Sequence, residues 1–358
     1  MHGRGFGVAY GVTAVGLGVA FWLGGMQSAM VVAMLALLEV ALSFDNAVVN
    51  ATVLRRFNEY WQKLFLSLGI IIAVLGMRLV IPMVVLVAAT GQSPARVLIR
   101  SVHDPNNFGH EIARVQPLIA AFGGVFLLMI FTDYFLDDHD QRWLSWFEDR
   151  AAALAVRVGV RRLAAAQITG VALFLAIAAL TFGHKHPAGV PAAGLIGLVS
   201  YLAIKHLSDT AADKSETLAD EAGDKAPPTG RQALILFCYL ELLDATFSSD
   251  SVMGGFSVTV DIALFTIGLG IGAAYVRCLT VYLVRRKTLE RYVYVEHGAY
   301  YSIGVLAVLL LVEIWHDVPD WFASLAGTSM IAAAYAHSVL HSRQEGPGAD
   351  RPATSKPG

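Results

Sequence analysis

The chain has 358 residues, of which 56% are hydrophobic and 15% are charged, and its formal net charge is −2. Soluble domains carry about 25% charged residues, so this composition indicates an integral membrane protein, and the near-neutral charge argues against a nucleic-acid partner. The two cysteines, Cys238 and Cys278, lie in separate apolar segments. Neither a disulfide framework nor a thiolate metal cluster is therefore predicted.

Ten apolar windows are long enough to cross a bilayer as helices, which takes about 20 residues each. In chain order they are 6–24, 28–53, 64–89, 117–136, 164–183, 189–205, 231–255, 260–284, 298–315 and 319–340. The predicted fold is an all-α polytopic membrane protein with about nine to ten transmembrane helices, contacting the lipid bilayer. We expect an N-terminal transmembrane helix within 1–27, a first half at 28–206, a cytoplasmic linker at 207–230, a second half at 231–341 and a disordered tail at 342–358.

The distribution of lysine and arginine predicts the orientation of these spans. With the N-terminus in the cytoplasm, 20 of the 26 basic residues lie on the inner side, four lie outside and two, Arg78 and Arg277, lie within apolar windows. Inner loops of membrane proteins are enriched in positive charge. Both termini are therefore predicted to be cytoplasmic, and the external segment 90–116 is predicted to be a solvated loop.

Two acidic motifs interrupt these apolar windows. The first motif, residues 39–48, and the second motif, residues 244–252, share an acid followed by Leu or Phe, Ser, Asp and then Asn or Ser at equal spacing. Because the predicted spans carrying them run in opposite directions, the motifs are predicted to form an inverted internal repeat. Secondary transporters commonly place a polar site between such repeats.

A regular helix cannot point all of these side chains at one place. At about 100° per residue, Glu39, Ser43 and Asn46 share one face, whereas Asp45 lies about 120° from Glu39. The second motif has the same mismatch at Asp250. We therefore expect either an interruption of the helix near 42–45 and 247–250, or a separate partner for each displaced aspartate.

The oxygens of the two motifs are candidates for a metal site. They come from Glu39, Ser43, Asp45, Asn46, Glu241, Asp244, Ser248, Asp250 and Ser251. Oxygen ligands suit Mg²⁺, Ca²⁺ or Mn²⁺ better than Zn²⁺ or Cu⁺. The five acids and the two arginines, Arg78 and Arg277, have a summed charge of about −3, which a divalent cation would reduce to about −1. A further hypothesis is that protons exchange for metal at these acids. The alternative is that the acid–arginine pairs only hold helices together.

Enzymatic chemistry is not predicted. The chain has no Gly-x-x-x-x-Gly-Lys-Ser/Thr loop, no His-Glu-x-x-His run and no Gly-x-Ser-x-Gly elbow, so no ATPase, zinc protease or serine hydrolase motif is present. Intramembrane proteolysis by Asp45 and Asp250 is disfavoured by the excess of other acids and hydroxyls. No organic cofactor is expected.

The motifs resemble those of the TerC family of bacterial membrane proteins, in particular a branch described only as a domain of unknown function. The resemblance rests on residues 39–50, 241–251, 76–82 and 297–300. It implies a relative of lysine-exporter-type transporters in the bacterial inner membrane, in a family with members linked to manganese efflux and to tellurium resistance. Carried over to this chain, the resemblance implies a metal-contacting set of Glu39, Asp45, Asn46, Asp244, Asp250 and Ser251.

Ser43, Ser248, Glu241, Arg78 and Arg277 are the expected supporting residues. The predicted function is divalent cation transport, with efflux of Mn²⁺ expected and Ca²⁺ the other candidate ion. The alternative is a membrane scaffold or stress-resistance protein of the tellurite-resistance type, whose acids are structural or bind Ca²⁺ and which contacts a second copy of itself or other membrane proteins.

Overall fold

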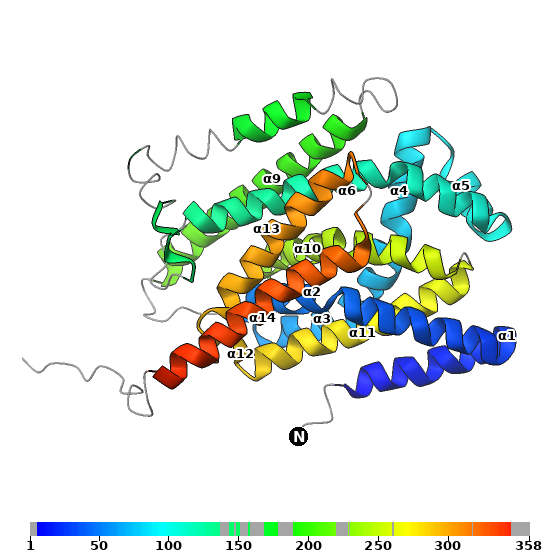
Figure 1. Cartoon of the computed structure of the whole chain (residues 1–358), viewed down its shortest axis with the longest axis horizontal. Coiled ribbons are helices and arrows are strands. Elements are labelled where there is room, and N and C mark those ends of the chain that lie inside the picture. The colour runs from blue at the N-terminus through cyan, green and yellow to red at the C-terminus, as the bar shows by residue number, and fades with distance from the viewer. Residues whose placement is uncertain are drawn as a thin grey trace, which may run out of the picture.

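The computed structural model describes residues 6–136, 143–146, 148–150, 157, 168–177, 189–219, 228, 230–259, 261–316 and 318–344 (Figure 1). Within these ranges all regular structure is helical. Six of the described helical segments are long and apolar enough to cross a membrane: Gly7–Leu42, Glu59–Thr90, Asn107–Tyr134, Gly189–Leu207, Ile262–Arg285 and Val295–Glu313. The prediction of an all-α polytopic membrane protein is confirmed.

Helices in chain order are α1 (Gly7–Leu42), α2 (Phe44–Leu54), α3 (Glu59–Ile71), the π-helix η1 (Ile72–Val80), α4 (Ile81–Thr90), α5 (Pro94–His103), α6 (Pro105–Leu136), α9 (Gly189–Ala219), α10 (Gly230–Val258), α11 (Ile262–Arg285), α12 (Thr288–Arg291), α13 (Val295–Glu313) and α14 (Asp320–Gln344). Asn58 accepts a hydrogen bond from the backbone N–H of Trp61 and so caps α3, and Asp261 caps α11 in the same way. Such caps satisfy N–H groups that have no partner within the helix.

Helix α1 is bent into a hairpin at Gly24 and Gly25 (Figure 1). Gly25 has φ 68°, in the region that favours glycine. Ala20 before the bend and Val32 after it both pack with Ile271 of α11 in one apolar cluster. The predicted window 6–24 therefore corresponds to the first arm of the hairpin, and the window 28–53 contains the second arm together with α2.

Helix α11 positions the candidate site because it is buried along most of its length. It packs against α1, α2, α3 and η1, whereas α13 packs against α6 and α14 and also contacts α2 (Figure 1). A large apolar cluster that includes Phe126, Leu240 and Leu306 joins α6, α10 and α13. Polar groups of α11 are consequently held away from water.

One expectation about the connecting segments differs from the structure. The external segment 90–116 is not a loop, because it contains α5 and the first turns of α6, with Pro94 at the start of α5. Proline is favoured in the first turn of a helix, where its missing N–H costs nothing. Helix α9 continues to Ala219, into the predicted linker 207–230, while residues 220–227 and 345–358 lie outside the described residues.

Candidate functional site

The first acidic motif is divided between two helices. Helix α1 ends at Leu42, Ser43 has a non-helical backbone (φ −107°, ψ 19°), and α2 begins at Phe44. The hydroxyl of Ser324 in α14 donates to the carbonyl oxygens of Ala41 (3.1 Å) and Leu42 (3.2 Å). Carbonyls at a helix end have no partner within the helix, so α14 supports the interruption that the sequence predicts here.

Asp45 lies in the first turn of α2 and has partners of its own. Its Oδ1 accepts the backbone N–H of Asn46 at 2.9 Å, and its Oδ2 accepts the Ser302 hydroxyl of α13 at 3.4 Å. Gly327 of α14 lies against this carboxylate, where a Cβ would overlap it. Both expectations for the displaced aspartate are met, because the helix is interrupted and Asp45 is separately partnered.

Glu39 forms an ion pair with Arg78 of η1, and both side chains are buried. The Ser43 hydroxyl donates to Glu39 Oε1 at 2.8 Å, while Arg78 Nη1 donates to the Ala73 carbonyl of its own helix at 2.9 Å. Within the described part of the chain, Glu39 Oε2 and Arg78 Nε have no hydrogen-bond partner. Gly272 of α11 leaves the space that the Glu39 side chain fills.

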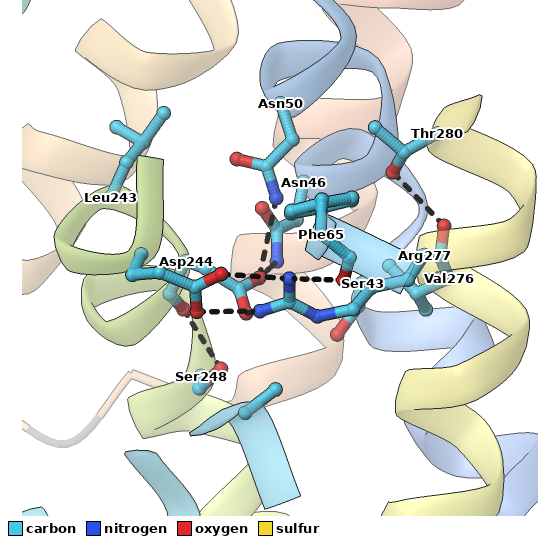
Figure 2. Close-up of polar contacts among 12 residues, drawn as sticks. Ser43, Asn46, Asn50, Phe65, Leu243, Asp244, Ser248, Val276, Arg277 and Thr280 are labelled. Atoms are coloured by element: carbon cyan, nitrogen blue, oxygen red, sulfur yellow. Dashed lines mark hydrogen bonds and ion pairs between the residues drawn. The ribbon is translucent and has the colours of Figure 1, made fainter. Parts of the chain in front are cut away.

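Arg277 of α11 is the centre of a second group of buried charges (Figure 2). Its Nη1 and Nη2 donate to the two oxygens of Glu241 at 3.0 and 2.8 Å, and Nη2 also donates to Asp244 Oδ2 at 2.8 Å. The guanidinium carbon lies 4.1 Å from the centre of the Phe65 ring, and Nη1 reaches the Phe65 carbonyl at 3.3 Å. Planar two-point pairing with a carboxylate is the geometry in which arginine binds most strongly.

Two asparagines join the first motif to the second. Asn46 Nδ2 donates to Asp244 Oδ1 at 2.6 Å, and Asn50 Nδ2, one helical turn later, reaches the same oxygen at 3.3 Å (Figure 2). The Oδ1 atoms of both asparagines are buried and have no hydrogen-bond partner among the residues described. Residues 198 positions apart in the sequence therefore share one carboxylate in the interior.

The second motif does not repeat the interruption of the first. Helix α10 is continuous from Gly230 to Val258, so of the two alternatives expected near 247–250 the interruption does not occur. The Ser248 hydroxyl donates to the Asp244 carbonyl at 2.8 Å and that of Ser251 to the Ser248 carbonyl at 3.0 Å, within the same helix. Serine is compatible with a continuous helix when it bonds to a preceding carbonyl in this way. The side chain of Asp250 lies outside the described residues.

The predicted site residues, apart from Ser248, Asp250 and Ser251 of α10, therefore form three neighbourhoods. Glu39, Ser43 and Arg78 form one, Asp45 lies in another, and the third contains Asn46, Glu241, Asp244 and Arg277. No group of three or more His, Cys, Asp or Glu side chains is placed to hold a metal ion in the part of the chain that the structure describes. The metal-binding role of the set stays a prediction.

Sequence reasoning missed several residues that complete these neighbourhoods. They are Asn50, Phe65, Gly69, Ser302, Ser324 and Gly327. Gly69 of α3 lies against Arg277 and Glu241, where a Cβ would overlap the Arg277 guanidinium. Only Asn50 carried a signal, because it lies one helical turn after Asn46 and therefore on the same face of α2. The others come from helices distant in the sequence, and only the folded chain brings them to the motifs.

The fold and this site define an all-α membrane protein with charged groups buried between its helices. The chain belongs to the family described as "Protein of unknown function (DUF475)", which it matches over residues 44–345. That range contains every predicted site residue except Glu39 and Ser43. No curated protein and no solved structure matches the chain. The resemblance to the TerC family is not tested by this match.

Proposed function

We propose that this protein transports a divalent cation, with Mn²⁺ the expected ion and efflux the expected direction, and that it is not an enzyme. The observation that carries the proposal is the bond between Asn46 and Asp244, which joins the two acidic motifs at a buried position. Ionisable groups inside a membrane are costly and commonly mark ion pathways. The bacterial inner membrane, with both termini in the cytoplasm, is the proposed location.

The balance of buried charge supports a divalent cation as substrate. Glu39, Asp45, Glu241 and Asp244 contribute −4 when ionised, and Arg78 with Arg277 contributes +2, which leaves −2 among the described groups of the site. A divalent cation neutralises this remainder. The unpartnered oxygens of Glu39, Asn46 and Asn50 are hard acceptors of the kind that Mn²⁺ and Ca²⁺ both accept.

The proposal is tested by ion flux into vesicles that contain the purified full-length chain. Mn²⁺, Ca²⁺ and Mg²⁺ are compared with and without a proton gradient, for the unmodified chain and for Asp45→Asn, Asp244→Asn and Asp250→Asn. The matched control is Asp133→Asn, since Asp133 pairs with Lys205 and both side chains are partly exposed. We expect Mn²⁺ flux in the unmodified chain and in the control, and its loss in the three motif variants.

Absence of flux for all three ions in the unmodified protein would refute transport. Flux that is insensitive to a proton gradient would refute only the hypothesis of exchange between protons and metal. Ca²⁺ flux without Mn²⁺ flux would change the substrate and leave the class of function unchanged.

A membrane scaffold or stress-resistance protein is the second candidate, and one observation favours it. The single side chain of Arg277, on α11, bonds to Phe65 of α3 and to Glu241 of α10. Its contacts therefore hold three helices together. In a scaffold that assembles with a second copy or another membrane protein, Asp244→Asn lowers stability and recovery of the partner while the unmodified chain shows no flux. Ca²⁺-dependent assembly would appear as a change of oligomeric state on addition of Ca²⁺.

A further inference from the structure

The two buried arginines are held very differently. Arg277 bonds to both oxygens of Glu241, to Asp244 and to a carbonyl, and it lies over an aromatic ring. Arg78 bonds to one oxygen of Glu39 and to a carbonyl of its own helix. The Nε atoms of both arginines lack a hydrogen-bond partner among the described residues, but only the Arg78 pair also leaves a carboxylate oxygen, Glu39 Oε2, without one. Arg277 is therefore fixed by several helices, whereas Arg78 is attached to the site by one contact.

Arg78 is carried by an unusual backbone. The nine residues of η1, Ile72–Val80, form a π-helix, and Arg78 is the charged residue in it. π-Helical turns are rare, and they frequently occur at functional sites. Conversion of part of η1 to α-helix would rotate and shift Arg78 relative to Glu39.

A cavity lies beside the η1 segment. It has a volume of about 590 Å³, is open to the surface of the molecule, and lies between the first arm of α1, the α3–η1 segment and α11. Its lining includes Gly11, Val74 and Ile267 and the exposed side chains of Val15, Ile71 and Leu75. Because the protein interior on the other side of η1 is close-packed, a shift of η1 would be directed toward this open side. The η1 segment is thus packed against α10 and α11 while another part of its surface borders open, apolar space.

We propose that Arg78 is a built-in competitor for the transported cation at Glu39, and that η1 is the movable segment that withdraws it. The inference rests on the proposed function. When Arg78 is seated, its guanidinium neutralises Glu39 and disfavours a second positive charge there. When a cation binds Glu39, repulsion between the two positive charges favours the position of η1 in which Arg78 is withdrawn. The position of Arg78 then distinguishes the cation-free state from the cation-bound state, and Arg277 keeps its position in both.

The first test measures Mn²⁺ binding to the purified full-length chain in detergent. We expect Arg78→Gln to bind Mn²⁺ about tenfold more tightly than the unmodified protein, a size typical of coupling between two ligands. Arg78→Lys keeps a competing charge and should bind as the unmodified protein does. Unchanged or weaker binding by Arg78→Gln, with normal binding by the unmodified chain, overturns the competitor and leaves the proposed transport intact. Absence of Mn²⁺ binding in both proteins overturns both proposals.

The second test addresses the movable segment. Gly11 lines the cavity and a side chain added there meets no atom within 4 Å, so Gly11→Phe fills the space beside η1. Gly18, on the same arm of α1, also has open space around it but does not line the cavity, and Gly18→Phe is the matched control. We expect Gly11→Phe to weaken Mn²⁺ binding about tenfold and Gly18→Phe to leave it unchanged.

The two variants combine into a double-mutant cycle, which isolates coupling between sites. If the cavity matters because η1 must withdraw Arg78, Gly11→Phe has no effect on Mn²⁺ binding in the Arg78→Gln background. An equal loss of binding in both backgrounds overturns the movable segment. If Arg78→Gln does not fold, the comparison of Gly11→Phe with Gly18→Phe still decides the proposal, because equal binding by those two variants refutes it.

Discussion

Replacement of Arg277 by methionine should destabilise the protein severely. The change leaves Glu241 and Asp244 buried without their cation and removes the contact with the Phe65 ring. Removing one partner of a buried ion pair costs about 3–5 kcal/mol, and a desolvated cation–π contact contributes about 2 kcal/mol. The expected loss is therefore about 5 kcal/mol, since part of the cost is relieved when a carboxylate becomes protonated.

The loss is measured as the change in unfolding free energy of the purified full-length chain, titrated with SDS in mixed micelles. Asp133→Asn is the control, because its pair with Lys205 is partly exposed, with 32% and 41% of the two side chains accessible. An exposed pair contributes at most about 1 kcal/mol. The triple change of Arg277→Met, Glu241→Gln and Asp244→Asn should recover part of the loss, because no carboxylate is then left buried without its cation.

A loss below about 1 kcal/mol for Arg277→Met would refute this reasoning, because it would mean that the acids are solvated or otherwise paired. Failure of the triple change to recover stability would show that the arginine acts through packing and not through charge.

Three further predictions follow from the contacts around the motifs. Gly272→Ala should destabilise the chain by about 1–3 kcal/mol in the same titration, because the added Cβ overlaps the Glu39 side chain and overpacking has this cost. Gly18→Ala is the control and should leave the stability unchanged, because a Cβ at Gly18 meets no atom within 4 Å. Asn46→Ala should weaken Mn²⁺ binding about tenfold and cost about 1.5–3 kcal/mol of stability, the range for a hydrogen bond to a charged group, and unaltered binding would remove Asn46 from the site. Ser324→Ala should accelerate amide hydrogen exchange around the interruption at Ser43, because two carbonyls there lose their donor.

The sequence alone was sufficient to predict the class of protein and to single out the acids of the two motifs. Apolar windows of about 20 residues depend only on local composition, because the bilayer requires satisfied backbone groups and apolar side chains along the whole span. The spacing of Glu39 and Asp45 was also informative, because the periodicity of a helix cannot bring both to one face. That mismatch predicted either an interruption of the helix or a separate partner for Asp45, and the structure has both near Ser43.

Only the tertiary structure decided how the charges are paired. The sequence treats the two motifs as equivalent, yet Ser324 of α14 supports an interruption in the first, whereas α10 continues through the second. The assignment of Arg78 to Glu39 and of Arg277 to Glu241 and Asp244 depends on how closely the helices approach, which Gly69 and Gly272 permit. The paired residues lie 39 positions apart for Glu39 and Arg78 and 33 positions apart for Asp244 and Arg277. Packing between the helices that carry them sets these approaches, and no local property of either motif encodes them.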